Sequence, residues 1–281
     1  MSQARGESPL VKGILITIAL GYMGLFLVMP LIVVLATGLN KGLVFYFHSL
    51  CDSNTLAAIR LTVLTALIAV PLNVIFGIAA SWAITKFDFY GKNVLLTLID
   101  LPLSVSPVIS GLIFVLMFGA QGAIGPWLME HNIKVIFAPG AIIVATIFVT
   151  FPMVARELIP LMKTQGNEEE EAAITLGASG FKTFWLITLP NIKWGLLYGV
   201  ILCNARAMGE FGAVSVVSGH IRGLTNTLPL HIEILYNEYQ FTAAFAAASL
   251  LAFLALGTLV VKSLVELRYK HELKFARRGG H

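Results

Sequence analysis

Six apolar stretches, each long enough to cross a lipid bilayer, dominate this sequence. A transmembrane helix needs about 20 mostly apolar residues to span roughly 30 Å of hydrocarbon. Charge-poor windows of that length recur between short polar loops through the whole chain. They cover residues 13–38, 61–85, 94–118, 139–162, 192–217 and 242–265. We therefore expect an all-α, polytopic membrane protein with six transmembrane helices.

Composition supports one membrane domain with short tails. Of the 281 residues, 57% are hydrophobic and only 12% are charged, which excludes an ordinary soluble domain. The first apolar window is longer than the 7–15 residues typical of a cleaved signal peptide, so we expect it to be retained. The expected divisions are an N-terminal tail (1–12), a transmembrane domain (13–265) and a basic C-terminal tail (266–281).

The distribution of Lys and Arg predicts the orientation, because cytoplasmic loops carry the excess. Twelve such residues fall on the side of both termini and four on the other side. Both termini and the acidic segment at 168–171 are therefore expected in the cytoplasm. The net charge of +4 then reflects membrane topology rather than nucleic-acid binding.

An acidic segment interrupts the apolar pattern between the fourth and fifth windows. Asn167 can cap a helix whose first turn is Glu168 to Glu171, where the positive end of the helix dipole favours carboxylates. Gly177 supplies a stop, since glycine adopts the left-handed conformation at little cost. For a charge run alone, an amphipathic interfacial loop with a solvated acidic face is the plainer interpretation.

A second short helix is expected directly after this one. Ser179 can cap it, and it would run through Phe184 and Trp185. Pro190 suits the first turn of the fifth span, with Leu189 held extended before it. The pattern predicts two short helices at an angle, lying on the cytoplasmic membrane face and attached to the fifth span.

The spacing of seven residues in this segment resembles the EAA signature of bacterial ABC importer permeases. In that family the segment, here 163–190, is a cytoplasmic coupling helix that docks in a cleft of the ATPase, within a type I importer fold. Small side chains there would leave room for the partner's surface. The resemblance assigns ATPase coupling to Glu171, Ala172, Ala173, Gly177, Ile187, Leu189 and Pro190.

The chain lacks a phosphate-binding loop of its own. No GxxxxGK[ST] pattern occurs, and the run Gly180-Phe181-Lys182-Thr183 lacks the adjacent Gly-Lys that cradles phosphates. We therefore expect no enzymatic activity and no cofactor in this chain. ATP and Mg would be bound by a partner ATPase, and its closure would move the helices between inward-open and outward-open states.

Ionisable residues inside the membrane are candidates for the substrate path, because burying them is costly. Arg206 and Glu210 lie in the second half of the fifth window, four residues apart on one helical face. They could simply neutralise each other. Alternatively, the Arg206 guanidinium lines the path and contacts an oxyanion, while Glu210 orients it. Gly209 and Gly212 would let a facing helix approach. Other charges in the spans are expected to pair locally or reach the interface: Asp100, Arg156 and Glu157.

Longer stretches resemble the sulfate/thiosulfate importer permeases, more closely the CysW type than the CysT type. The stretches are NARAMGEFGAVSVVSGHIRG (204–223), TVLTALIAVPLNVIFGIAASWAITKFDFYGK (62–92), LPLSVSPVISGL (101–112) and TIFVTFPMVARELIPLM (146–162). The resemblance implies a heterodimer with a second, CysT-like permease, two copies of an ATPase and an extracytoplasmic sulfate-binding protein in a bacterial inner membrane. The ARAxGEFGA core also occurs in molybdate permeases, so a molybdate/tungstate permease is the alternative.

The resemblance also implies that the loop 218–240 faces the binding protein. His220 and Arg222 would contact that protein, beside a short amphipathic segment from Leu228 to Tyr236. An ordinary interfacial loop anchored by aromatic side chains is the other interpretation of the same residues.

Two further classes of protein are weaker candidates. An ion-coupled secondary transporter would be expected to show repeated halves and midplane carboxylates, and no repeat accompanies the prolines Pro71, Pro102 and Pro107. An intramembrane enzyme or a metal site would need a suitable constellation, whereas the six histidines are all expected in loops or the tail. Cys51 and Cys203 are expected to be packing residues without a disulfide.

Overall fold

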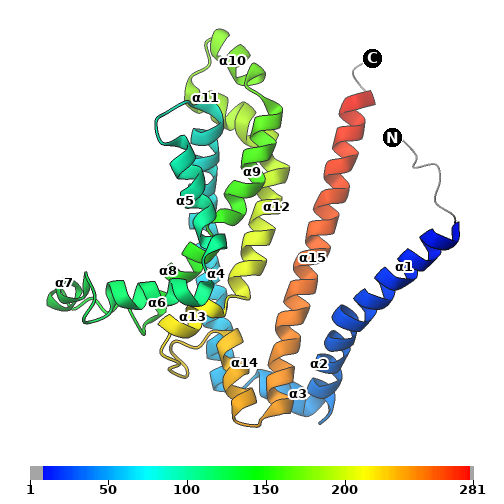
Figure 1. Cartoon of the computed structure of the whole chain (residues 1–281), viewed down its shortest axis with the longest axis vertical. Coiled ribbons are helices and arrows are strands. Elements are labelled where there is room, and N and C mark those ends of the chain that lie inside the picture. The colour runs from blue at the N-terminus through cyan, green and yellow to red at the C-terminus, as the bar shows by residue number, and fades with distance from the viewer. Residues whose placement is uncertain (1–8, 279–281) are drawn as a thin grey trace.

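A computed structural model describes residues 9–278, with side chains from residue 10 to residue 264, and every regular element in that range is a helix (Figure 1). Most of the expected N-terminal tail and the last three residues of the chain lie outside the described residues. The rest of the expected C-terminal tail continues the last helix. The elements are α1 (Pro9–Met23), a π-helical turn η1 (Gly24–Val28), α2 (Met29–Leu39), α3 (Leu43–Leu50), α4 (Ser53–Lys86), α5 (Lys92–Ser104), α6 (Pro107–Phe118), α7 (Gly125–Glu130), α8 (Pro139–Thr150), α9 (Pro152–Gln165), α10 (Glu168–Thr175), α11 (Gly180–Thr183), a second π-helical turn η2 (Phe184–Thr188), α12 (Leu189–Met208), α13 (Gly212–Val217), α14 (Leu228–Asn237) and α15 (Phe241–Arg278).

Five helices are long and apolar enough to cross a membrane, and a sixth span is possible if one bent pair is counted. They confirm the expected first, second, fourth and sixth spans, and the first and second extend beyond their apolar windows at both ends. The five cover Leu10–Leu39, Ser53–Lys86, Pro139–Gln165, Gly180–Met208 and Phe241–Leu264.

The third span is not the straight helix that the window 94–118 predicted. The chain bends by 107° between α5 and α6. Val105 and Ser106 are extended, with ψ of 136° and 134°, before Pro107 begins α6. The proline ring disfavours a helical conformation in the residue before it, which explains the break.

The fifth span also differs from its window, 192–217. The helix ends at Met208, and after Gly209 the chain breaks before the separate short helix α13. At the other end of this span, the prediction that Leu189 is extended before Pro190 is wrong. Leu189 is helical (φ −65°, ψ −43°), because its backbone N–H donates to Phe184 O and η2 carries the helix through. The helical run is therefore continuous from Gly180 to Met208.

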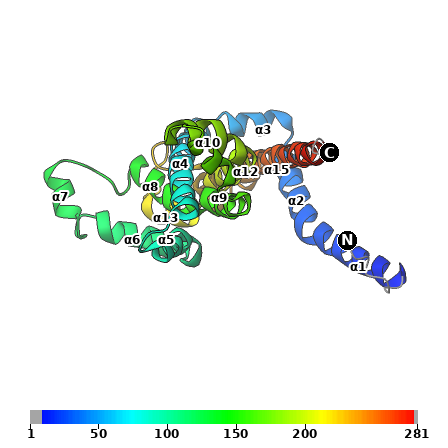
Figure 2. The ribbon, with the colours of Figure 1, turned by 90° about the horizontal axis from the view of Figure 1, so that it is seen from above.

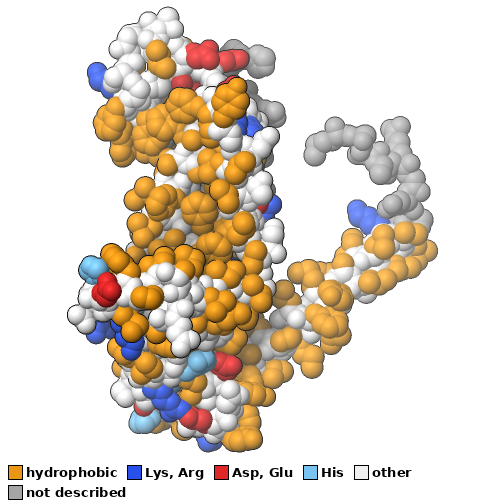
Figure 3. Space-filling model, turned by 60° about the vertical axis from the view of Figure 1, so that its left-hand side comes forward, with side chains coloured by type: hydrophobic (Ala, Val, Ile, Leu, Met, Phe, Trp, Pro, Cys, Tyr) orange, Lys and Arg blue, Asp and Glu red, His pale blue; other side chains and the backbone are white. Residues whose placement is uncertain are grey.

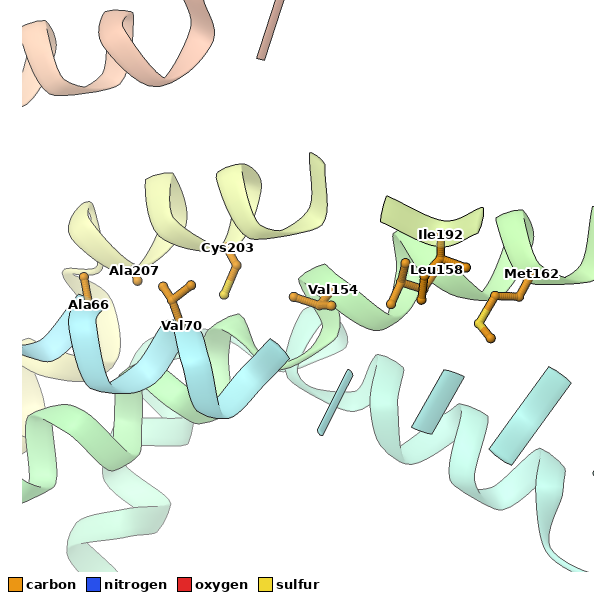
Figure 4. Packing of buried hydrophobic residues seen from close by; sticks show 8 residues of the cluster. All are labelled: Ala66, Val70, Val154, Leu158, Met162, Ile192, Cys203 and Ala207. Atoms are coloured by element: carbon orange, nitrogen blue, oxygen red, sulfur yellow. The ribbon is translucent and has the colours of Figure 1, made fainter. Parts of the chain in front are cut away.

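The centre of the molecule is the packing of α4, α9 and α12. Figure 4 shows small and medium apolar side chains of these three helices facing one another. Around this body, α15 packs against α2, α12 and α14, while the α6–α7 arm extends to the opposite side from α1 (Figure 2). The central cluster consists of Ala66, Val70, Val154, Leu158, Met162, Ile192, Cys203 and Ala207.

Close helix approach depends on a glycine in α4. A Cβ atom added at Gly77 would lie 2.7 Å from Val154 Cβ, on the facing helix α9. Small residues at such crossings let membrane helices pack tightly. A side chain at this position would therefore force the α4–α9 interface to shift.

We predict that Gly77→Ala lowers the free energy of unfolding by about 1–3 kcal/mol, because overpacking forces neighbouring side chains and backbone to move. The melting temperature of the purified protein in detergent would measure this. Gly140→Ala is the matched control, since its added methyl group would meet nothing within 4 Å. Equal melting temperatures for the two variants would contradict the prediction.

The surface agrees with a membrane location. Hydrophobic side chains cover the middle of the face in Figure 3, with acidic side chains near the top and charged side chains again near the bottom. None of the most apolar window in Leu10–Leu39 is buried within the chain. The first span must therefore be covered by something outside this chain, such as lipid or another subunit.

Candidate functional site

The acidic segment forms a helical tip at one end of the molecule (Figure 1). α10 begins with the four glutamates and ends before Gly177, which has φ +88°, while Gly177 N donates to Ile174 O at 2.9 Å. Ser179 then caps α11 by accepting from Lys182 N. These features confirm two short helices separated by a left-handed glycine. Asn167 precedes α10 as expected, but its side chain makes no capping hydrogen bond.

The residues that resemble the EAA signature divide between the surface and the interior. Glu171, Ala172 and Gly177 are exposed, whereas Ala173 is buried within this chain. That face of α10 packs against the rest of the chain, where α10 contacts α11 and η2. In the part that joins the tip to α12, Ile187 and Leu189 are half-buried and Pro190 is exposed.

Three large apolar side chains stand out from the same tip, and sequence reasoning missed them. Ile174, Leu176 and Phe181 are 57%, 89% and 75% exposed. They flank Gly177 on both sides in the chain. Exposed apolar side chains grouped on a polar segment are typical of a protein-interaction surface. We call this group, with Glu171, Ala172 and Gly177, the coupling tip, after the role that the resemblance to the EAA signature implies.

Two of the four glutamates hold α10 in place. Glu170 Oε2 lies 2.9 Å from Lys86 Nζ, and its Oε1 accepts from Thr188 Oγ1 at 3.1 Å. Glu169 accepts from the side chain of Asn191 in α12. The acidic run is therefore not a fully solvated face, because Glu169 and Glu170 bind other parts of the chain.

Arg206 and Glu210 form an ion pair at the end of the fifth span. Arg206 Nη1 lies 2.7 Å from Glu210 Oε2, with 36% of the arginine side chain and 1% of the glutamate side chain exposed. Glu210 Oε1 also accepts from Ala213 N at 3.0 Å, at the start of α13. The expected pairing of Arg206 with Glu210 is confirmed. The two residues do not share one helical face, however, because Glu210 lies in the break after α12.

The two glycines beside this pair differ in role. A Cβ atom on Gly212 would lie 3.0 Å from Pro107 Cβ in α6, so the expected close approach is confirmed there. At Gly209 the only atom that an added Cβ would meet within 4 Å is Ala205 O of the preceding turn. Among the described residues, no atom of a facing helix lies within 4 Å of that Cβ position, so the expected close approach is not seen at Gly209.

Another charged pair crosses between helices. Arg156 Nε lies 3.4 Å from Asp100 Oδ1, joining α9 to α5. Both side chains are more than half exposed. This confirms the expected local pairing of those two residues.

The loop 218–240 lies at the end of the molecule opposite the coupling tip (Figure 1). His220 is exposed and its Nε2 lies 3.1 Å from Ser215 O, while Arg222 pairs with Glu238 across the loop. The expected amphipathic segment is confirmed as α14, whose apolar face packs on α15 and α4. His220 and Arg222 are thus both exposed in this loop, each with a different partner.

His231 shows that the expectation for the histidines is wrong, because it lies buried in α14, and His48 lies in α3. His231 Nε2 is 3.0 Å from Thr55 Oγ1. Burial lowers the pKa of His231 below its usual value; nearby Asp52 raises this pKa and Arg222 lowers it further. The imidazole is thus held neutral between α14 and the start of α4.

We predict that α14 loosens as the pH falls below about 6.5, the usual pKa of histidine. The pKa of His231 is lower in the folded state, so the unfolded state binds more protons as the pH falls. The neutral His231 contributes its full stability above about pH 6.5. This contribution is lost as the pH falls from there toward the folded-state pKa. Hydrogen exchange of the α14 amides at pH 7.5 and 5.5 would measure this. A His231→Gln variant with the same pH dependence as the wild type would contradict it.

Comparison with known proteins places this geometry in a family. Residues 73–271, more than half of the chain, match the family described as binding-protein-dependent transport system inner membrane component. The chain is 49% identical over 270 residues to the sulfate transport system permease protein CysW of Escherichia coli K12, covering 96% of this chain and 93% of that protein. It is 33% identical over 266 residues to the CysT permease protein of the same strain, covering 93% and 94%.

The fold agrees with this relationship. A bacterial ABC transporter involved in the import of the polysaccharide alginate has a chain that superposes with a TM-score of 0.75 at 16% identity, covering 93% of this chain and 95% of that one. A second structure of such a transporter, in complex with an alginate-bound periplasmic protein, gives a TM-score of 0.74 at 16% identity, covering 91% and 92%. The chain belongs to the inner membrane components of binding-protein-dependent transport systems and, among them, to the CysW permeases.

Proposed function

We propose that this chain is one permease subunit of an ATP-driven importer of sulfate and thiosulfate. The observation that carries the proposal is the 49% identity to a CysW sulfate permease across 96% of the chain. That identity spans both the coupling tip and the Arg206–Glu210 pair. The chain would form half of a translocation path and transmit the work of a separate ATPase to it.

The coupling tip is the proposed docking site for the ATPase. Its exposed Glu171, Ala172 and Gly177 and the apolar side chains around Gly177 offer a surface that a cleft in another protein can enclose. ATP and Mg would be bound by two copies of that cytoplasmic subunit. Closure of the pair on ATP would push the tip and shift the helices between inward-open and outward-open states.

A second, CysT-like permease is the proposed partner within the membrane. The exposed first span supports this, since a subunit with an uncovered apolar helix needs lipid or protein around it. At the opposite end from the tip, His220 and Arg222 would meet an extracytoplasmic sulfate-binding protein. The alginate transporter in complex with a periplasmic protein offers a structural analogy for that arrangement.

The proposed location is the bacterial inner membrane, with both termini in the cytoplasm. The excess of Lys and Arg on one side supports this orientation. In Figure 1, α15 runs toward the end of the molecule that carries α10. The C-terminal residues and the coupling tip would then face the same compartment as the ATPase.

Arg206 is the proposed anion contact in the path. A doubly charged sulfate cannot cross hydrocarbon unless donors or water replace its hydration. The pairing with Glu210 uses Nη1, and about a third of the arginine side chain stays exposed. Glu210 would orient the guanidinium, whose planar N–H donors suit oxyanions. High-affinity recognition would be left to the binding protein.

Competition for transport tests the substrate class. Proteoliposomes would hold this chain, the second permease and the ATPase, with internal ATP and external sulfate-binding protein. We expect unlabelled sulfate and thiosulfate to suppress uptake of labelled sulfate. Suppression by molybdate alone, with labelled molybdate accumulating in place of sulfate, would assign the chain to the molybdate class instead.

A further inference from the structure

Glu170 differs from its neighbours in the acidic run. Glu168 and Glu171 are exposed, whereas the Glu170 side chain is 17% exposed and both of its carboxylate oxygens have partners. One oxygen meets Lys86 Nζ at 2.9 Å and the other accepts from Thr188 Oγ1 at 3.1 Å. This carboxylate points into the molecule rather than toward a docking partner.

The Lys86 side chain is also largely buried in this contact. It is the last residue of α4, its side chain is 9% exposed, and its Nζ also donates to Gly166 O at 2.5 Å in the turn before α10. A cation at a helix C-terminus is favoured by the helix dipole. A pair this far from water is held more firmly than an exposed ion pair, because leaving either charge alone would be costly.

These contacts join three elements, of which α4 lies far from the other two in the sequence. Lys86 ends α4, Glu170 lies in α10, and Thr188 ends η2, which continues into α12. Asn191 strengthens the join, because its side chain donates to Glu169 and its carbonyl oxygen accepts from Gln165 Nε2 at 2.9 Å. Both α4 and α12 contribute to the central apolar cluster.

We propose that Lys86 and Glu170 are positioning residues that lock α10 to α4 and α12, so that force on the coupling tip moves the central helices as one body. This rests on the proposed function, since the force comes from the ATPase. With the lock broken, α10 could tilt on Gly166 and Gly177, whose φ values of +72° and +88° mark the ends of the segment. The ATPase would then still dock and hydrolyse ATP, but less of its work would reach the path.

The test is the number of sulfate ions imported per ATP hydrolysed by the reconstituted complex. We expect Lys86→Met and Glu170→Gln each to lower this ratio about fivefold to tenfold, with no further loss in the double variant. Lys86→Arg, which keeps the charge and the donors, should retain most of the ratio. Glu168→Gln is the matched control, because it removes an exposed carboxylate of the same run.

Assembly must be measured beside the ratio. Co-purification of the ATPase and the melting temperature of the complex show whether a variant still folds and docks. An unchanged ratio in assembled Lys86→Met and Glu170→Gln complexes would overturn the lock. Wild-type complexes without ATP-dependent uptake would overturn the proposed function instead, and the two failures are therefore distinguishable.

Discussion

Gly177→Leu is expected to reduce ATP-driven sulfate uptake by about tenfold or more, the largest loss from any single change at the coupling tip. A side chain at φ +88° costs about 1–2 kcal/mol in backbone strain, so the turn between α10 and α11 would reshape. The added side chain would also stand on the proposed docking surface, where a glycine now lies open to solvent. Both effects would disturb the proposed contact with the ATPase rather than the membrane helices.

Gly42→Leu separates these two effects. Gly42 has the same φ of +88° and the same open surroundings, but it lies between α2 and α3, at the end of the molecule opposite α10 (Figure 1). A side chain at Gly42 is also strained, because its φ of +88° and ψ of 166° lie in a region almost restricted to glycine, and a docking role is absent there. We expect this variant to keep most of its uptake and its ATPase in the purified complex. Equal losses in the two variants would mean that strain alone matters and that the tip does not dock.

Arg206→Met is expected to abolish most uptake and to lower the stability of the purified permease. Removing the guanidinium leaves the carboxylate of Glu210, 1% exposed, without its cation. Breaking a fully buried pair costs several kcal/mol, and the partial exposure of Arg206 reduces the expected loss to about 1–3 kcal/mol. The melting temperature and the rate of uptake are to be measured on the same preparations.

The double variant Arg206→Met with Glu210→Gln separates structure from transport. Gln keeps an oxygen that can accept from Ala213 N and removes the stranded charge. If Arg206 contacts the anion, stability recovers in the double variant while uptake stays low. Recovery of both would mean that the pair only neutralises itself at the end of α12. Normal uptake in Arg206→Met alone would also remove Arg206 from the path.

The sequence predicted the parts of the fold that depend on local chemistry. Apolar windows located the spans because bilayer thickness fixes their length, and Gly177 and Ser179 marked a turn and a cap because few residues suit those positions. The breaks were harder. The apolar pattern continues through Ser106 and through Gly209, so hydrophobicity alone could not show that the third and fifth spans end or bend there.

The candidate site was predictable only in its exposed, motif-bearing part. The resemblance to the EAA signature marks Glu171 and Gly177, but four adjacent glutamates look alike in a sequence. Which of them turns inward depends on where Lys86 and Thr188 lie in space, at separations of 84 and 18 residues. The burial of His231 was missed for the same reason, since its partner Thr55 lies in another helix 176 residues away.

The most direct test of the account is uptake of labelled sulfate into proteoliposomes with each component omitted in turn. The account predicts uptake only when this chain, the second permease, the ATPase, internal ATP and the external binding protein are all present. Sulfate accumulation by this chain alone, driven by an ion gradient without ATP, would contradict it and make the chain a secondary transporter.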